Sequence, residues 1–328
     1  MIKKLISVIT LSALLFNLTG CHATQATQIN NNNNNNNNKL NIVCTGFSEY
    51  DWTKELLGTH ADDVNLIYLL NNGMDLHNYQ PSAKDMITIS ECDVFIYTGS
   101  ISDNWVDDAL GEVTNSNRQV INLMDIVSVK EEELKEGMQI DEHEHEQEEN
   151  SDYDEHVWLS VKNAEMICHT IGNVLCELDS EHAQDYQENL KNYQEKLDSL
   201  DKNFMQLAEE SSVKTLLFAD RFPFRYFADD YGFDYYAVFT GCSTETEASF
   251  ETILFLAQKI DELHAETIFK IENSSDAIAK SIIASTSEKN QIIVSLNSMQ
   301  SVNAKDIANG ASYLSIMQDN LEILQEVL

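Results

Sequence analysis

The sequence predicts an α/β protein of two lobes, each with a parallel sheet flanked by helices, joined by one long rigid helix. Short apolar runs alternate with helical patterns in residues 39–178 and again in residues 211–328, which is typical of parallel strands with crossover helices. Between them, residues 179–210 keep a helical period without any run of strand type. We therefore expect an N-terminal α/β lobe, a linker helix and a C-terminal α/β lobe with these bounds.

Four apolar runs in the N-terminal lobe have the length and the β-branched or aromatic content of buried strands. They are residues 40–45, 65–70, 93–99 and 119–123. They are separated by helical patterns over residues 50–57, 83–90 and 105–110. The strands should therefore run parallel, with helices on both faces of the sheet.

The linker helix is predicted from one apolar stripe that recurs every three or four residues over about eight turns. Its members are Leu190, Tyr193, Leu197, Leu200, Phe204 and Leu207. Ser180 followed by Glu181 is typical of an N-cap with an acidic first turn. A helix of this length between two α/β regions is expected to act as a spine.

The C-terminal lobe repeats the alternation of strands and helices. Its predicted strands are residues 215–219, 235–239, 267–271 and 291–296, and its main predicted helices are residues 249–263, 277–285 and 313–328. Ligands of parallel sheets bind beyond the carboxyl ends of the strands. His77 and Asp220 both follow predicted strands and are expected at such ends.

The first 38 residues have the pattern of a targeting segment and a tether. Residues 1–21 combine a basic start with an apolar stretch and end in Leu-Thr-Gly-Cys, which resembles a bacterial lipobox and predicts lipidation of Cys21. A plain secretory signal with an incidental cysteine is the alternative. Residues 22–38 contain nine consecutive asparagines and predict a disordered tether. We therefore expect an extracytoplasmic protein anchored to the membrane by lipid.

The formal net charge of −35 restricts the partners of this chain. It argues against nucleic acid and against anionic lipid bound through a basic surface. Solubility is one explanation of the charge, and attraction of cations is a second one.

Five cysteines remain besides Cys21, and none forms a CxxC pair. An odd number without a dense framework indicates that disulfides do not hold this fold together. A bridge between Cys44 and Cys92 remains open.

Two histidine segments carry the chemistry of the sequence. One is residues 75–82, around His77, and the other is residues 154–160, around His156, with an acidic run over residues 141–149 before it. Neutral imidazole is the commonest ligand for borderline metals, and carboxylates add oxygen donors. Together with a secretion signal, this pattern indicates capture of a transition metal outside the cytoplasm. A zinc hydrolase is disfavoured because the sequence has no HExxH motif, so we expect no enzymatic activity.

These segments resemble the metal-binding lipoproteins of bacterial ABC importers for zinc and manganese. The resemblance covers nearly all of the chain after residue 38. Its motifs are His77-x-Tyr79-x-Pro81-Ser82, Asp154-x-His156-x-Trp158-Leu159-Ser160, Phe224-x-Tyr226-Phe227 and Tyr313-Leu314-x-x-Met317-x-x-Asn320. It implies a monomeric solute-binding protein that captures one metal ion between two lobes and delivers it to a membrane permease.

The resemblance implies that His77 and His156 are the two ligands from the N-terminal lobe. His143 and His145 lie in the acidic run, which resembles a loop of the zinc-binding branch. They are either auxiliary metal ligands or part of a solvated acidic loop.

The C-terminal lobe departs from the family pattern. Arg221 stands where the family usually has a histidine or glutamate, and arginine cannot coordinate because it stays protonated. Asp220 is the candidate ligand there, unless it pairs with Arg221. Cys242 as a thiolate, with Glu245 or Glu247, is a further candidate, unless this turn is only an acidic helix N-terminus.

This donor set favours Zn²⁺, with Mn²⁺ as the alternative cargo, because manganese prefers oxygen-rich octahedral sites. A surface adhesin and a drifted relative with weak metal binding remain alternative functions.

Overall fold

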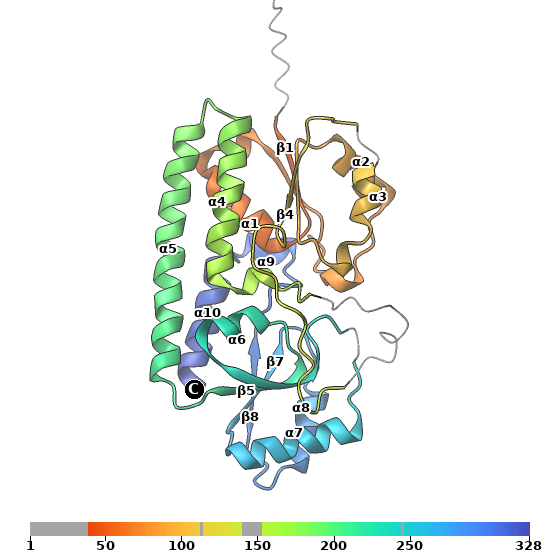
Figure 1. Ribbon diagram of the computed structural model, residues 1–328, viewed down its shortest axis with the longest axis vertical. Helices are drawn as coiled ribbons and strands as arrows, with labels where there is room; N and C mark the ends of the chain where they lie inside the picture. The colour runs from red at the N-terminus through yellow and green to blue at the C-terminus, as the bar shows by residue number, and fades with distance from the viewer. Residues whose placement is uncertain (1–38, 112–113, 140–152, 244–245) are drawn as a thin grey trace, which may run out of the picture. The chain divides into compact units, whose positions relative to one another are not determined.

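Two parallel four-stranded sheets form the framework of the described residues, which are 39–111, 114–139, 153–243 and 246–328 of the computed structural model (Figure 1). The first sheet has the order β2-β1-β3-β4 and the second has the order β6-β5-β7-β8, so the two lobes share one topology. The strands are β1 (Asn41–Cys44), β2 (Asn65–Tyr68), β3 (Val94–Tyr97), β4 (Gln119–Asn122), β5 (Thr215–Arg221), β6 (Asp234–Phe239), β7 (Thr267–Ile271) and β8 (Ile292–Leu296). The predicted fold class is confirmed.

Helices connect the strands as the alternating pattern predicts. In the first lobe they are α1 (Phe47–Leu57), α2 (Ala83–Glu91), α3 (Val106–Gly111) and α4 (Val161–Leu178). In the second lobe they are α6 (Arg225–Tyr231), α7 (Phe250–Leu263), α8 (Ala277–Ser285), α9 (Ala304–Ala308) and α10 (Tyr313–Val327). Short polar side chains cap several of them: Ser160, for example, accepts a hydrogen bond from the Asn163 backbone N–H at the start of α4.

The long helix α5 (Ala183–Glu210) has 28 residues, so it spans about 42 Å. All six members of the predicted apolar stripe are buried in it. Near its C-terminal end, the Phe204 ring packs edge-on against Phe227 of α6 at a centroid distance of 5.0 Å, and α4 and α1 of the first lobe also pack against α5. One rigid helix therefore contacts both lobes, as Figure 1 shows.

The N-cap predicted at Ser180 is wrong. The helix begins at Ala183 with His182 as its N-cap, and no side-chain capping bond forms there among the described residues. Asp179 organises the turn instead, since its carboxylate contacts His182 Nδ1 at 2.8 Å and accepts a 2.7 Å hydrogen bond from Tyr186 Oη.

The last helix ties the second lobe back to the first. The backbone N–H of Tyr313, at the start of α10, donates to Asp51 of α1 at 2.8 Å, and its hydroxyl donates to the carbonyl of Trp158 at 2.9 Å. Tyr313 is fully buried, in a hydrophobic cluster with members from both lobes. The two lobes therefore share a core as well as the long helix.

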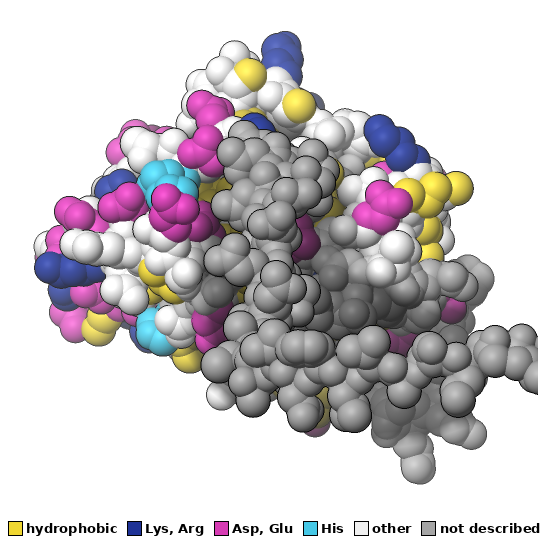
Figure 2. Space-filling model, turned by 90° about the horizontal axis from the view of Figure 1, so that it is seen from above, with side chains coloured by type: hydrophobic (Ala, Val, Ile, Leu, Met, Phe, Trp, Pro, Cys, Tyr) yellow, Lys and Arg dark blue, Asp and Glu magenta, His cyan; other side chains and the backbone are white. Residues whose placement is uncertain are grey.

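All five cysteines of the described residues are unpaired, so Cys44 and Cys92 form no bridge there. Acidic side chains spread over much of the described part of the face in Figure 2, as the net charge suggests. No helix in the described ranges combines the length and apolar character needed to cross a membrane.

Candidate metal centre

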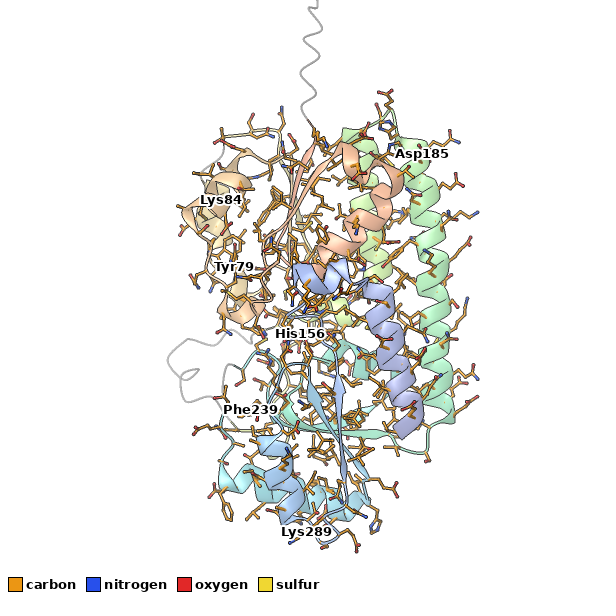
Figure 3. All side chains as sticks on the ribbon, turned by 180° about the vertical axis from the view of Figure 1, so that it is seen from behind. Tyr79, Lys84, His156, Asp185, Phe239 and Lys289 are labelled. Atoms are coloured by element: carbon orange, nitrogen blue, oxygen red, sulfur yellow. The ribbon has the colours of Figure 1, made fainter. Side chains whose placement is uncertain are left out.

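Three loops carry the candidate metal-binding residues His77, His156 and Cys242, and the structure brings two of them, His77 and Cys242, into one close group with Glu155. His77 lies in a short 3₁₀ turn (Leu76–Asn78) after β2, where the Asp75 side chain accepts a 3.1 Å hydrogen bond from the His77 backbone N–H. His156 directly precedes a second 3₁₀ turn (Val157–Leu159), and Cys242 follows β6. Figure 3 shows His156 between the lobes. The loops after strand ends therefore form the site, as parallel sheets favour.

His77, Glu155 and Cys242 form a potential metal-binding cluster. One ligand atom from each residue lies within 4.8 Å of those of the other two. Within the described ranges, this is the single group of three or more histidine, cysteine or acidic residues with such spacing. The side chains of His77 and Glu155 are only 3% and 0% exposed. The cluster therefore combines nitrogen, oxygen and sulfur donors in a largely dehydrated site.

Glu155 sets the orientation of the His77 ring. Its Oε1 lies 2.7 Å from His77 Nδ1 and also accepts a 3.0 Å hydrogen bond from Ser102. Burial alone would raise the pKa of Glu155, but the charge and hydrogen bond of His77 bring that pKa below its ordinary value. The carboxylate thus favours a proton on Nδ1, which leaves the Nε2 lone pair of His77 directed elsewhere.

His156 is held in the same way by Asp154. The Asp154 Oδ1 lies 3.0 Å from His156 Nδ1 and accepts a 2.9 Å hydrogen bond from the His156 backbone N–H. Burial lowers the pKa of His156, but Asp154 and Glu155 raise it to a net value above the ordinary one. The two histidine rings lie 5.4 Å apart between centroids.

Two buried polar atoms at this site lack a hydrogen-bond partner among the residues that the structure describes. They are His156 Nε2 and Glu155 Oε2. An unsatisfied buried donor or acceptor costs about 1–3 kcal/mol, so such atoms are rare unless a ligand or water satisfies them. Glu155 belongs to the group with His77 and Cys242, whereas His156 is not a member of that group and directly follows Glu155 in the chain.

Gly241 allows the C-terminal lobe to approach His156. A Cβ atom at this position would lie 3.1 Å from two atoms of the His156 ring and 3.0 Å from the Phe222 carbonyl oxygen. Glycine is therefore the residue that fits between this turn and the imidazole.

Cys242 is the candidate sulfur donor from the C-terminal lobe. Its backbone N–H donates to Glu132 at 3.0 Å. Burial, followed by the charges of Glu155 and Glu132, raises the pKa of the Cys242 thiol well above its ordinary value. A bound cation would reverse this balance, because metal coordination stabilises the thiolate.

Arg221 lies at the end of β5 and contacts the first lobe. Its guanidinium forms an ion pair with Asp75 and donates a 2.9 Å hydrogen bond to Gln300 Oε1. The Gln300 Nε2 lies 3.3 Å from His77 Nε2. A side chain that cannot coordinate a metal therefore lies one hydrogen-bonded residue away from His77 of the candidate group.

The structure does not bring Asp220 into this group. Its Oδ1 accepts a 2.9 Å hydrogen bond from the Arg221 backbone N–H, and its Oδ2 accepts one of 3.2 Å from Ile271. The Arg221 guanidinium pairs with Asp75 rather than with Asp220. We therefore leave Asp220 out of the site and assign its carboxylate to joining β5 and β7.

The sequence reasoning missed Glu155. The order Asp154-Glu155-His156 contained a signal for Glu155. A carboxylate directly before the candidate ligand His156 is well placed to contact a second metal-binding histidine, here His77. Four other predicted residues, Cys21, His143, His145 and Glu245, lie outside the described residues.

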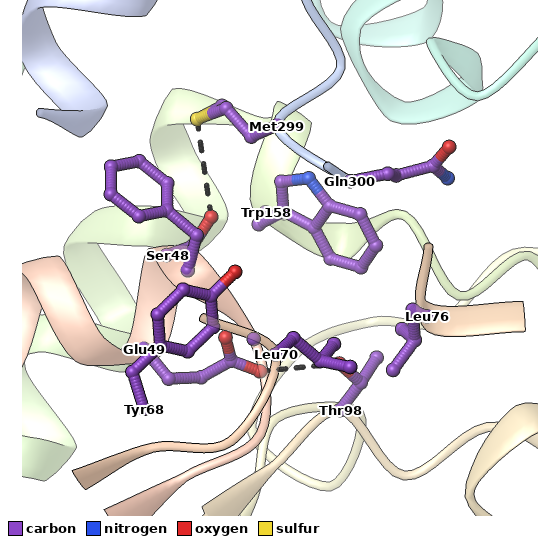
Figure 4. Close-up of a pocket in the computed structure, with 11 residues that line it drawn as sticks. Ser48, Glu49, Tyr68, Leu70, Leu76, Thr98, Trp158, Met299 and Gln300 are labelled. Atoms are coloured by element: carbon purple, nitrogen blue, oxygen red, sulfur yellow. Dashed lines mark hydrogen bonds between the residues drawn. The ribbon is translucent and has the colours of Figure 1, made fainter. Parts of the chain in front are cut away.

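A small cavity lies behind the site (Figure 4). Its volume is about 20 Å³, enough for one water molecule, and Glu49, Trp158, Met299 and Gln300 are among its lining residues. Burial raises the pKa of Glu49 to about 7. The Trp158 indole N–H donates to the Ser298 carbonyl at 2.9 Å, which joins the two lobes beside this cavity.

Relatives with known names resemble this chain over most of its length. The zinc-binding lipoprotein AdcA of Streptococcus pneumoniae is 29% identical over 88% of this chain, which spans only 56% of that relative. The high-affinity zinc uptake system protein ZnuA of Bacillus subtilis is 26% identical over 88% of both chains. The Zn(II)-bound ZnuA-like domain of S. pneumoniae AdcA has a similar structure, with a TM-score of 0.70 and 27% sequence identity. The match covers 88% of this chain and 98% of that domain.

The family of periplasmic zinc-uptake complex component A matches residues 42–327. This match confirms the resemblance inferred from the histidine segments and includes both lobes and the long helix. The chain therefore belongs to the family of zinc-uptake complex component A.

Proposed function

We propose that this protein captures Zn²⁺ between its two lobes and delivers it to the membrane permease of an ABC importer. The observation that carries the proposal is the buried cluster of His77, Glu155 and Cys242 beside two unsatisfied atoms, His156 Nε2 and Glu155 Oε2. The proposed ligands are His77, Glu155, His156 and Cys242. Two imidazoles, one carboxylate and one thiolate are donors that zinc accepts in a four-coordinate site.

The sulfur and nitrogen donors favour zinc over manganese. Manganese prefers oxygen ligands in octahedral geometry, whereas this site offers a single carboxylate among its four side chains. The similar proteins AdcA and ZnuA, which are named for zinc binding and zinc uptake, support the same cargo.

The proposed role is transport rather than catalysis. Catalytic zinc sites keep one position open for water or substrate, while this site offers four protein donors. In this proposal the protein is monomeric, Cys21 carries the lipid anchor, and the domain bounds are those predicted from the sequence.

Calorimetric titration of the metal-stripped full chain with Zn²⁺, and separately with Mn²⁺, tests the proposal. We expect tight one-to-one zinc binding, weaker manganese binding, and loss of zinc binding in the His77→Ala, His156→Ala double variant. The His169→Ala variant is the control, because His169 lies on α4, outside the group of His77, Glu155 and Cys242, and its Nδ1 lies 3.1 Å from the Asn173 side-chain nitrogen. Absence of zinc binding by the wild-type protein would refute the proposal.

A second pair of variants tests the sulfur ligand. Cys242→Ser replaces a thiolate donor by a hydroxyl, so it should weaken zinc binding strongly. Cys176→Ser changes a cysteine outside the cluster and should leave zinc binding unchanged. Equal affinity of the two variants would remove Cys242 from the site.

A further inference from the structure

A chain of polar contacts crosses the cleft next to the proposed metal ligands. The Arg221 guanidinium pairs with Asp75 and donates to Gln300 Oε1, and Gln300 Nε2 reaches His77 Nε2. Asp75 and His77 belong to the first lobe, while Arg221 and Gln300 belong to the second. These contacts therefore join the two lobes at two points, Arg221–Asp75 and Gln300–His77.

This chain of contacts lies in a protected environment. The Arg221 side chain is 13% exposed, and Gln300 is 4% exposed. Arg221 also donates to the Ser243 carbonyl at 3.4 Å, beside Cys242. Low exposure strengthens such charge-assisted contacts, because water does not screen them well.

Arg221 determines which end of the Gln300 amide faces His77. The amide oxygen of Gln300 accepts from the guanidinium, so the amide NH₂ points at His77 Nε2. His77 Nε2 is the ring nitrogen that Glu155 leaves unprotonated, and its lone pair serves either the amide N–H or a metal ion. Metal binding through this nitrogen must therefore break the contact with Gln300.

We propose that Arg221 is a tethered cation that competes with the metal: it bridges the cleft of the metal-free protein and presents the Gln300 amide nitrogen to His77. This inference rests on the proposed function, with Zn²⁺ as the cargo. The guanidinium supplies positive charge among the carboxylates when no metal is bound. Because the same contact must break for any ion that binds through His77 Nε2, the competition lowers the affinity for every such ion by the same factor.

Loss of the Arg221 side chain should therefore strengthen metal binding. Without the guanidinium, Gln300 is free to turn its amide oxygen towards the cleft, and Asp75 becomes an unpaired carboxylate near the cation. Because a hydrogen bond to a charged group is worth a factor of about ten or more, we expect Arg221→Met to bind zinc about tenfold more tightly than the wild type. Manganese affinity should rise by the same factor.

Titration of the metal-stripped Arg221→Met full chain with Zn²⁺ and Mn²⁺ tests the inference. The matched control is Arg225→Met, since Arg225 is similarly buried (20% exposed) and pairs with Asp229 on its own helix, away from the cluster. Tighter binding of both ions by Arg221→Met, with no change in Arg225→Met, supports the inference. Unchanged or weaker zinc binding by Arg221→Met overturns it.

A second variant decides the question if Arg221→Met does not fold. Gln300→Ala keeps the Arg221–Asp75 ion pair and frees His77 Nε2, so it should also bind zinc more tightly. Unchanged affinity in Gln300→Ala overturns the competition. The proposed function fails separately, and only if the wild-type protein itself binds no zinc in the same titrations.

Discussion

Replacing Asp154 by asparagine tests how the first lobe presents His156 to a metal. The Asp154 carboxylate contacts His156 Nδ1 at 3.0 Å and the His156 backbone N–H at 2.9 Å through the same oxygen. Asparagine keeps an acceptor for the backbone N–H but removes the negative charge beside the ring. The variant should therefore keep the loop in place while it weakens the orientation and basicity of His156.

The size of the effect follows from the burial of this pair. Hydrogen-bond partners of metal-binding histidines contribute about 10- to 100-fold to metal affinity, equivalent to about 1.4–2.7 kcal/mol. The His156 and Asp154 side chains are 0% and 2% exposed, so water cannot replace the lost contact. We therefore expect Asp154→Asn to weaken zinc binding by about 30- to 100-fold, in the upper half of this range.

Competition calorimetry against a chelator of known zinc affinity measures the change. Asp179→Asn is the matched control, because Asp179 contacts His182 Nδ1 at 2.8 Å in a partly exposed pair at the start of α5. In the metal-free protein, Asp154→Asn should also lower the pKa of His156, which NMR titration of the ring reports. Wild-type zinc affinity in Asp154→Asn would refute the reasoning.

Three further predictions concern stability and packing. Burial raises the pKa of Asp51 from 3.8 to about 7, so the native state binds more protons than the unfolded chain between these values and loses stability as pH rises through them. Thermal scans should show that Asp51→Asn raises the unfolding temperature most at about pH 8, less at about pH 5 and least below about pH 4. Gly241→Ala should weaken zinc binding several-fold in calorimetry, because the added methyl group would press on the His156 ring. Unchanged affinity would mean that the backbone around residue 241 shifts to make room for the methyl group. Tyr313→Phe should lower the free energy of unfolding, measured in urea, by about 1–3 kcal/mol, because the buried Trp158 carbonyl loses its hydrogen-bond donor. A smaller loss would indicate that a water molecule replaces the tyrosine hydroxyl as donor.

The fold was predictable because its signals are local. Each predicted strand contains or overlaps an observed one, since short apolar runs between helical patterns are typical of strands in a parallel sheet. The stripe from Leu190 to Leu207 similarly predicted the buried face of α5. The start of that helix was mispredicted, because Asp179 contacts His182 and Tyr186 three and seven residues along and so competes with a cap at Ser180.

The site was predictable only where its residues carry a local motif. His77 and His156 stand in recognisable segments, and the structure places their rings 5.4 Å apart. The partner of Arg221 lies 146 residues away, at Asp75, so no neighbouring pattern reveals it. Asp220 was favoured by its place after a strand, but the sequence does not show that both of its oxygens accept backbone N–H groups.

The asymmetry of the site bears on how cargo leaves it. The first lobe supplies three of the four proposed ligands, His77, Glu155 and His156, and the second lobe supplies Cys242 alone. Hydrogen bonds that need no metal also join the lobes, including those from the Trp158 indole to Ser298 and from the Tyr68 hydroxyl to Val302. Because these contacts and α5 hold the lobes together, separation of whole domains is an expensive route for release. In the proposed function, movement of the Cys242 turn together with the return of Gln300 to His77 would remove one proposed ligand and block a second.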